Sequence, residues 1–230
     1  MATMRAVLWD MDGTLVDSEK LWDISMHALY ARMGGVLSPQ VRESTVGGSA
    51  EGVMRIVYSD LGLEHDPAAM LESIDWLHVK TGELFAAGLP WQDGAQELLE
   101  ALLVAGVPMA LVTNTRRDLA EQALNSIGRQ YFTVTVCGDE VARGKPAPDP
   151  YLRAVELLGV DPVQCLAVED SVTGTLSAET AGCPVLVVPS DVEVPTSPRR
   201  RHAGSLKELG VDDLRAIHAE LESRVGETSY

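Results

Sequence analysis

The sequence predicts an α/β fold in which a parallel sheet, covered by helices on both faces, is interrupted by a helical insertion. Two observations lead to this fold class. Short apolar runs rich in strand formers alternate with amphipathic helical segments over most of the chain, and such near-continuous apolar strands are typical of buried parallel sheets. Between residues 17 and 89, helical periodicity appears without intervening strands. With 230 residues and 46% hydrophobic content, the chain can bury a core and a modest inserted domain.

The core elements follow from their local patterns. Arg5–Trp9 is an apolar run that ends in a polar, glycine-containing turn, so it predicts a buried strand. The other predicted strands are Val107–Val112, Thr133–Cys137, Gln164–Val168 and Pro184–Val188. The predicted helices of the core are Ala95–Ala105, Arg116–Ile127, Pro150–Leu158, Val172–Ala181 and Val211–Val225.

The insertion is expected to be wholly helical. Its predicted helices are Leu21–Met33, Val53–Asp60 and Ala68–Leu84. Gly88-Leu89-Pro90 is a breaker sequence that marks the return to the core. We therefore assign residues 1–16 and 90–230 to the core and residues 17–89 to the insertion. Pro189–Gly204 contains three prolines and no periodicity, so it is expected to be a loop.

Composition excludes several classes of partner. A formal net charge of −16 and a pI near 4.6 argue against extended contacts with nucleic acid or with anionic membranes. No stretch reaches the roughly 18 to 20 apolar residues that a membrane span needs, and we expect a cytoplasmic protein. The three cysteines, Cys137, Cys165 and Cys183, are odd in number and form no CxxC pair, so buried free thiols are expected.

Two acidic pairs follow predicted strands. Asp10 and Asp12 come after the first strand, and residues two apart in an extended segment point the same way. A DxD sequence alone also fits a solvated turn. Glu169 and Asp170 follow the fourth strand. One interpretation of this second pair is that it caps the next helix and has no further role. Because ligands of open parallel sheets bind beyond the carboxyl ends of the strands, four acids there predict a site for a divalent cation, and oxygen ligands suit Mg²⁺.

The same edge of the sheet also offers groups that bind anions. The second strand ends in Thr113-Asn114-Thr115 at the start of a helix, and helix N-termini bind anions. Lys145 lies in Gly144-Lys145-Pro146-Ala147-Pro148, a loop whose prolines restrict the backbone. An ammonium beside acidic groups can hold a phosphoryl group during its transfer. Helix capping and a solvated lysine are the alternative interpretations of these residues.

These residues, in this order, resemble the haloacid dehalogenase superfamily of phosphotransferases over nearly the whole chain. Asp10-Met11-Asp12-Gly13-Thr14-Leu15-Val16-Asp17-Ser18 is similar to the signature of that family. The resemblance implies a Rossmann-like core with an inserted α-helical cap domain, as in the β-phosphoglucomutase-like and phosphoglycolate-phosphatase-like branches. It also implies a phosphatase that acts on a small phosphorylated metabolite, such as a phosphosugar, with Mg²⁺ as cofactor.

The resemblance implies a role for each matching residue. Asp10 would be the nucleophile that forms an aspartyl phosphate, and Asp12 the general acid and base. Thr113, Asn114 and Lys145 would bind the phosphoryl oxygens. The implied metal ligands are Asp10, the backbone carbonyl of Asp12, Asp170 and, through water, Glu169.

Three other activities remain as alternatives. A phosphosugar mutase would share every core residue, but its branch has a histidine and a cap arginine where our alignment by eye places Trp22 and Ala50. A dehalogenase lacks the second signature acid, which is Asp12 here. A non-catalytic sensor of a phosphorylated metabolite would keep the fold without turnover, although every catalytic position is filled.

Substrate recognition is assigned to the cap. The candidate loop is Gly47-Gly48-Ser49-Ala50-Glu51, with Gly47, Gly48 and Ser49 as the predicted substrate contacts. Trp22, His78 and Lys80 are further candidates, although Trp22 also fits a core position and the other two could be solvated. Arg199-Arg200-Arg201 is expected to be exposed and receives no function. The oligomeric state is open, and a monomer is compatible with the sequence.

Overall fold

The computed structural model describes residues 3–46, 48–188 and 193–227. Its described residues form one six-stranded sheet in which every pairing is parallel and the strand order is β3-β2-β1-β4-β5-β6. This is the order of a Rossmann-like doubly wound sheet, so the predicted fold class is confirmed. The strands are β1 Ala6–Trp9, β2 Met109–Val112, β3 Val134–Val136, β4 Cys165–Glu169, β5 Val185–Val187 and β6 Arg200–His202.

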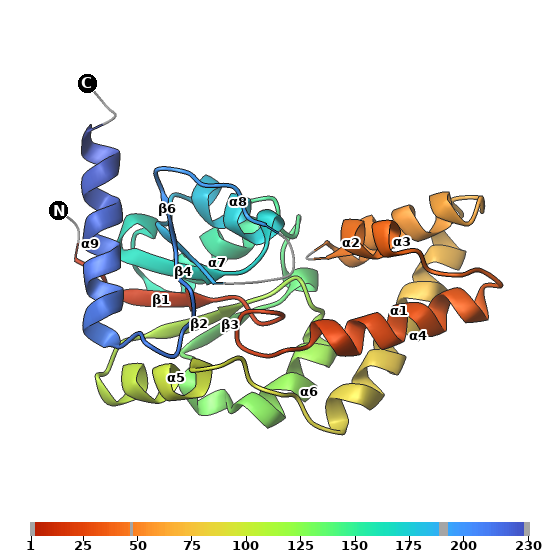
Figure 1. The fold of residues 1–230 in the computed structure, drawn as a ribbon, viewed down its shortest axis with the longest axis horizontal. Coiled ribbons are helices and arrows are strands. Elements are labelled where there is room, and N and C mark those ends of the chain that lie inside the picture. The colour runs from red at the N-terminus through yellow and green to blue at the C-terminus, as the bar shows by residue number, and fades with distance from the viewer. Residues whose placement is uncertain (1–2, 47, 189–192, 228–230) are drawn as a thin grey trace.

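Helices cover both faces of the sheet (Figure 1). One face packs against α5 Ala95–Val104, α6 Arg117–Ile127 and α9 Val211–Glu227, and the other against α7 Asp149–Leu158 and α8 Val172–Ala181. The short 3-10 helices are η1 Arg129–Tyr131, η2 Gly138–Glu140 and η3 Pro162–Gln164. In β1, Val7 and Trp9 join the first hydrophobic cluster while Ala6 and Leu8 join the second. Burial of both faces explains why β1 is apolar at consecutive positions.

Four further helices lie at the end of the molecule toward which β1 runs (Figure 1). They are α1 Glu19–Arg32, α2 Pro39–Thr45, α3 Ala50–Asp60 and α4 Pro67–Ala86. Apolar residues of α1, α3 and α4 form a third hydrophobic cluster, separate from the two beside the sheet. The expected helical character of residues 17–89 agrees with this arrangement, and the proposed division of the chain at residues 17 and 89 stays a prediction.

Helix α2 is an element that the apolar periodicity did not predict. Its sequence is almost entirely polar, so the pattern of a buried helix face is missing. Its first turn nevertheless contains Pro39, whose fixed φ suits a helix start. The hydroxyl of Ser38 accepts a hydrogen bond from the backbone N–H of Val41 at 3.3 Å. Capping, rather than an apolar face, identifies this helix in the sequence.

The expectation that residues 189–204 form only a loop is wrong at its end, where β6 pairs with β5. Residues 189–192 lie outside the described residues. Arg200 was expected to be exposed, yet it is 9% exposed. Its guanidinium donates two hydrogen bonds to the Glu179 carboxylate, at 2.9 and 2.7 Å, and one to the backbone oxygen of Pro195 at 2.8 Å. Bidentate pairing with Glu179 allows an arginine to be buried at the edge of the sheet.

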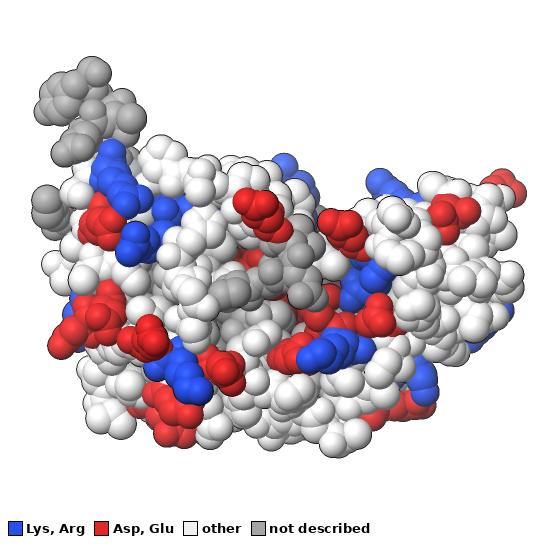
Figure 2. Space-filling model, in the orientation of Figure 1, with Lys and Arg blue, Asp and Glu red and all other residues white. Residues whose placement is uncertain are grey.

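All three cysteines are free and buried, as predicted. Of the helices built from described residues, none has both the length and the apolar character needed to span a bilayer. On the face shown in Figure 2, acidic and basic side chains are interspersed rather than gathered into a basic patch.

Replacing Arg200 by alanine is expected to lower the free energy of unfolding by about 2 kcal/mol, because the partly buried Glu179 carboxylate loses its cationic partner and two charge-assisted hydrogen bonds. Urea denaturation of the wild type and the variant measures this change. The neighbouring Arg201 is exposed, so Arg201→Ala is the matched control and should have little effect. Equal stability of the two variants would contradict a structural role for the Arg200 pair.

Candidate active site

The predicted site residues meet at the carboxyl ends of three adjacent strands. Asp10 follows β1, Thr113 follows β2, and Glu169 ends β4. The central strand β1 pairs with β2 on one side and β4 on the other, and connections leave the sheet in opposite directions there. A cavity of about 100 Å³ opens at this point. It is lined by residues of the core and by residues of α1, α2, α3 and α4, which we call the cap helices. The sheet topology therefore places the candidate residues in one pocket.

Three acids form a compact buried cluster. Oxygen atoms of Asp10, Glu169 and Asp170 lie within 4.8 Å of one another, and these residues are 7%, 0% and 3% exposed. Burial raises the pKa of Asp10 to about 7, against the lowering effect of Lys145. Burial, together with the charges of Asp10 and Glu169, raises the pKa of Asp170 well above its usual range. The cluster thus concentrates negative charge that the protein only partly balances.

Lys145 supplies the positive charge inside the cluster. Its ammonium donates to Asp10 Oδ1 and to Glu169 Oε1, both at 2.6 Å, and the residue is 3% exposed. Burial alone would lower the pKa of Lys145, but the charges of Asp10 and Glu169 raise it overall. Tyr151 donates to the same oxygen of Glu169 at 2.7 Å. Lys145 therefore stays protonated between two carboxylates.

Two glycines permit this close packing. Gly13 has φ +85°, and a Cβ there would lie 2.1 Å from Asp170 Oδ2. At Gly174, in the first turn of α8, a Cβ would lie 2.0 Å from the Glu169 carboxylate. A side chain at either position would displace an acid of the cluster. The glycine of the Asp-Met-Asp-Gly turn is thus explained by the approach of Asp170.

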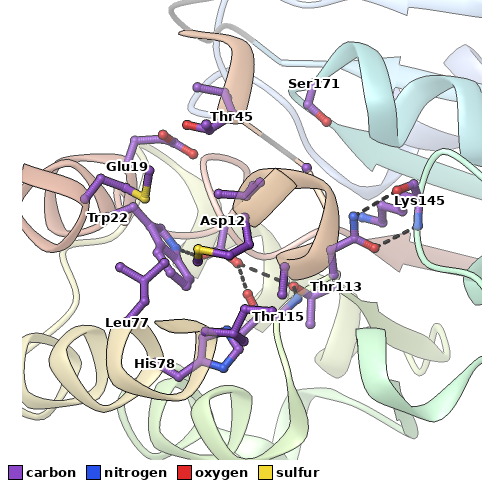
Figure 3. A pocket seen from close by; sticks show the side chains of 18 of the residues that line it. Asp12, Glu19, Trp22, Thr45, Leu77, His78, Thr113, Thr115, Lys145 and Ser171 are labelled. Carbon is purple, nitrogen blue, oxygen red and sulfur yellow. Dashed lines mark hydrogen bonds between the residues drawn. The ribbon is translucent and has the colours of Figure 1, made fainter. Parts of the chain in front are cut away.

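Asp12 lies in the same pocket but belongs to a different hydrogen-bond network (Figure 3). Its Oδ1 accepts from Ser18 Oγ at 2.6 Å and from Trp22 Nε1 at 3.0 Å. Its Oδ2 accepts from Thr115 Oγ1 at 2.7 Å and from Thr113 Oγ1 at 3.4 Å. Sequence reasoning missed Ser18 and Thr115 as partners of Asp12. A hydroxyl six residues after an acidic turn has no signal of its own in a single sequence.

The sequence predicts that Asn114 binds substrate, and in the structure its side chain also hydrogen-bonds the backbone of Lys145. The amide oxygen accepts from the backbone N–H of Lys145 at 2.7 Å, and the amide nitrogen donates to the Lys145 carbonyl at 3.1 Å. These two bonds fix the loop that presents the ammonium. Asn114 also lines the pocket, so the predicted contact with substrate stays a prediction.

The cap residues predicted to bind substrate differ in their placement. Gly47 lies outside the described residues, and Gly48 lines the pocket. The hydroxyl of Ser49 instead caps α3, where it accepts from the backbone N–H of Gly52 at 3.2 Å. Trp22 and His78 both line the pocket.

Lys80 has a different position from its neighbour His78. Its ammonium pairs with Glu83 at 2.9 Å, and it is not among the residues that line the cavity. The pocket also includes Arg42 and Thr45, which the sequence did not indicate because helix α2 was not predicted. Because the polar sequence of α2 did not predict a helix, the part of the pocket that α2 lines was not predicted either.

The acidic cluster fits a divalent cation. Three buried carboxylates face one ammonium, and the raised pKa values of Asp10 and Asp170 reflect this imbalance. Carboxylate oxygens are the ligands that Mg²⁺ prefers, and a cation among them favours their ionised forms. The donor set of the described cluster contains neither sulfur nor imidazole, which zinc and copper favour.

Known proteins resemble the chain in sequence and in fold. A family model for haloacid dehalogenase-like hydrolases matches residues 4–182. Hexitol phosphatase A of Escherichia coli (strain K12) is 34% identical over 195 residues, which cover 83% of this chain and 86% of that protein. A phosphoglycolate phosphatase of Thiobacillus denitrificans is 31% identical over 189 residues, covering 81% and 83%.

A solved structure extends the similarity of the fold. β-Phosphoglucomutase from Clostridium difficile superposes with a TM-score of 0.82, covering 96% of this chain and 99% of that chain at 16% identity. That likeness concerns the fold alone. The match of the family model to most of the chain, and relatives above 30% identity, decide the assignment: the chain belongs to the haloacid dehalogenase-like hydrolase family and is an enzyme of that family.

Proposed function

We propose that this enzyme, a phosphoric monoester hydrolase, uses Mg²⁺ and an aspartyl phosphate on Asp10 to hydrolyse a small phosphorylated metabolite. One observation supports this proposal above the others. Asp10 lies in a buried cluster with Lys145 and Asp170, while Asp12, in the same pocket, belongs to a separate set of hydroxyl and indole donors. Two carboxylates of one turn thus have environments that suit different roles.

In the first step, an oxygen of Asp10 attacks phosphorus and the bond between phosphorus and the leaving oxygen breaks. Asp12 gives its proton to that oxygen, so the leaving group departs as an alcohol. Lys145 orients the Asp10 carboxylate through its bond of 2.6 Å and offsets negative charge on the phosphoryl oxygens. Thr113, which follows β2 and lines the pocket, would donate to a phosphoryl oxygen.

In the second step, a water molecule attacks phosphorus of the aspartyl phosphate. Asp12 accepts the proton of this water, and the bond between phosphorus and the Asp10 oxygen breaks. Phosphate is released and Asp12 regains the proton that it gave in the first step. The same acid and base group thus serves both steps, and four donors fix the orientation of its carboxylate.

Asp10, Asp170 and the backbone carbonyl of Asp12 are the groups that would hold Mg²⁺, with Glu169 acting through water. The cation would supply positive charge that lets an anionic nucleophile approach an anionic phosphoryl group. In the structure, one oxygen of Glu169 already accepts from Lys145 and Tyr151. Bonds to protein donors agree with an indirect contact of this carboxylate with the metal.

Hydrolysis, rather than isomerisation, remains the preferred reaction. Trp22 occupies a position where the mutase branch was expected to have histidine, and its indole donates to Asp12. A sensor would not need an acid and base group ordered in this way. The cytoplasmic location and the monomeric state stay predictions.

Asp10→Asn is expected to reduce the turnover of 4-nitrophenyl phosphate by a factor of roughly 10³ or more, because the amide is a poor nucleophile. Release of 4-nitrophenol with Mg²⁺ present measures this loss. Asp93→Asn alters an exposed acid outside the pocket and serves as the control. Full activity of Asp10→Asn would exclude the aspartyl phosphate.

Asp12→Asn should separate the two steps. 4-Nitrophenolate leaves without protonation, so the first step continues, whereas the second step loses the base that activates water. We expect a burst of about one equivalent of 4-nitrophenol per enzyme, followed by slow release. Rapid-quench measurements detect it, and Asp10→Asn should show none. A steady rate equal to the wild type in Asp12→Asn would show that Asp12 is not the base.

Mg²⁺ should stabilise the fold through the acidic cluster. At a concentration 100 times its dissociation constant, we expect an increase of about 2.7 kcal/mol in the free energy of unfolding. Urea denaturation at several Mg²⁺ concentrations measures it. Asp170→Asn should lose most of this gain, while Asp212→Asn, whose side chain is 95% exposed, should keep it.

The gain from Mg²⁺ should also depend on pH. Because the pKa of Asp10 is raised to about 7 in the folded protein, the metal-free fold holds a proton that the unfolded chain releases from about pH 4 upward. Without Mg²⁺, the contribution of Asp10 to the free energy of unfolding therefore falls as the pH rises from about 4 to 7. At pH 8 Asp10 is mainly ionised, so Mg²⁺ can bind it without displacing a proton, whereas at pH 5.5 it must displace one. The increase in the free energy of unfolding on adding Mg²⁺ should therefore be larger at pH 8 than at pH 5.5. Equal gains would contradict binding at Asp10.

A further inference from the structure

The cap wall of the pocket is mainly apolar. It is formed by Trp22 and Met26 of α1, Val53 and Met54 of α3, and Leu77 of α4. This wall faces the acids of the core across the cavity. The carbon skeleton of a substrate that extends away from the phosphoryl group would therefore contact apolar side chains of the cap helices.

His78 adds an imidazole to this wall, on which Glu19, Arg42 and Thr45 are also polar. It lines the pocket and is 7% exposed, and its ring contacts the indole of Trp22 edge to face with centroids 6.3 Å apart (Figure 3). Its Nδ1 is buried and has no hydrogen-bond partner among the described residues. Burial, followed by the charge of Arg116, lowers the pKa of His78, so the ring is neutral near pH 7. A neutral imidazole offers one donor and one acceptor, and a hydroxyl group can bond to either.

The charges around the cavity disfavour an acidic leaving group. Apart from Lys145, the cation lining the described pocket is Arg42, and it is already paired with Glu19 at 2.6 Å and with Asp23 at 3.3 Å. Glu19 itself lines the pocket together with the acids of the core. On the cap side of the cavity, a substrate carboxylate or second phosphate would lie near Glu19, where Arg42 already has acidic partners.

We propose that His78 and Trp22 form the subsite for the leaving group, and that this subsite selects an uncharged, hydroxyl-bearing alcohol such as a polyol or sugar. The inference rests on the proposed phosphatase function and names the substrate class of that site. His78 hydrogen-bonds a hydroxyl of the alcohol, while the indole of Trp22 packs against its carbon skeleton and donates to Asp12. Because Trp22 contacts both residues, the leaving group is bound next to the acid that protonates its oxygen.

The test compares kcat/KM for sorbitol 6-phosphate, 2-phosphoglycolate and 4-nitrophenyl phosphate. The wild type should prefer sorbitol 6-phosphate to 2-phosphoglycolate. His78→Phe keeps a ring against Trp22 but removes both hydrogen-bonding nitrogens, so kcat/KM for sorbitol 6-phosphate should fall roughly tenfold relative to that for 4-nitrophenyl phosphate, mainly through KM. His78→Gln, whose amide keeps a donor and an acceptor, should retain more of the preference. If His78→Phe fails to fold, the kcat/KM values of His78→Gln for the three substrates test the subsite instead.

Lys80→Ala is the matched control, since Lys80 lies on the same helix and is paired with Glu83 outside the pocket. It should keep the wild-type ratios. A wild-type preference for 2-phosphoglycolate, or an equal loss on all three substrates in the His78 variants, would overturn the subsite. Turnover of 4-nitrophenyl phosphate that depends on Asp10 tests the phosphatase function separately. Its absence would overturn the proposed function, and the subsite with it.

Discussion

The buried ammonium of Lys145, held between Asp10 and Glu169, is the interaction on which the site depends. Three carboxylates at the ends of β1 and β4 would repel one another in a region that excludes water, and Lys145 is the cation that approaches two of them at 2.6 Å. An isolated buried charge is far more costly than a paired one. The parallel sheet brings the acids together, and Lys145 makes their proximity tolerable.

Residues outside the acidic cluster support this ammonium. Asn114 binds both the N–H and the carbonyl of Lys145, so the end of β2 determines where the lysine loop lies. Tyr151 of α7 donates to Glu169 and places its ring 5.2 Å from the ammonium. Gly13 and Gly174 leave room for the carboxylates. Contacts from four separate segments hold one charge pair, which is the rigidity that a preorganised electrostatic site requires.

The sequence could predict the parts of the fold and site that follow from local patterns. The strands from β1 to β5 are predominantly apolar runs. The acids lie at or just after strand ends, and Lys145 lies in a loop that contains two prolines. The edge strand β6 could not be predicted, because its residues are Arg-Arg-His and its burial depends on Glu179, distant in sequence. Arg42 was missed because its helix lacks an apolar face. The long-range partner of β6 leaves no record in a single sequence, whereas the local signal of α2 is limited to its N-terminal cap at Ser38 and Pro39.

The partners of Asp12 connect the chemistry to the cap. One carboxylate oxygen is held by Ser18 and Trp22, at the start of the helical segment, and the other by Thr113 and Thr115, which follow a core strand. A shift of α1 against the sheet cannot preserve both sets of bonds, since hydrogen bonds weaken steeply with distance and angle. The orientation of the proposed acid and base group is therefore determined jointly by cap and core. Because the indole of Trp22 also lines the cavity, a ligand bound against this indole would contact the residue that orients Asp12, and the proposed substrate binding and proton transfer would then be coupled through one side chain.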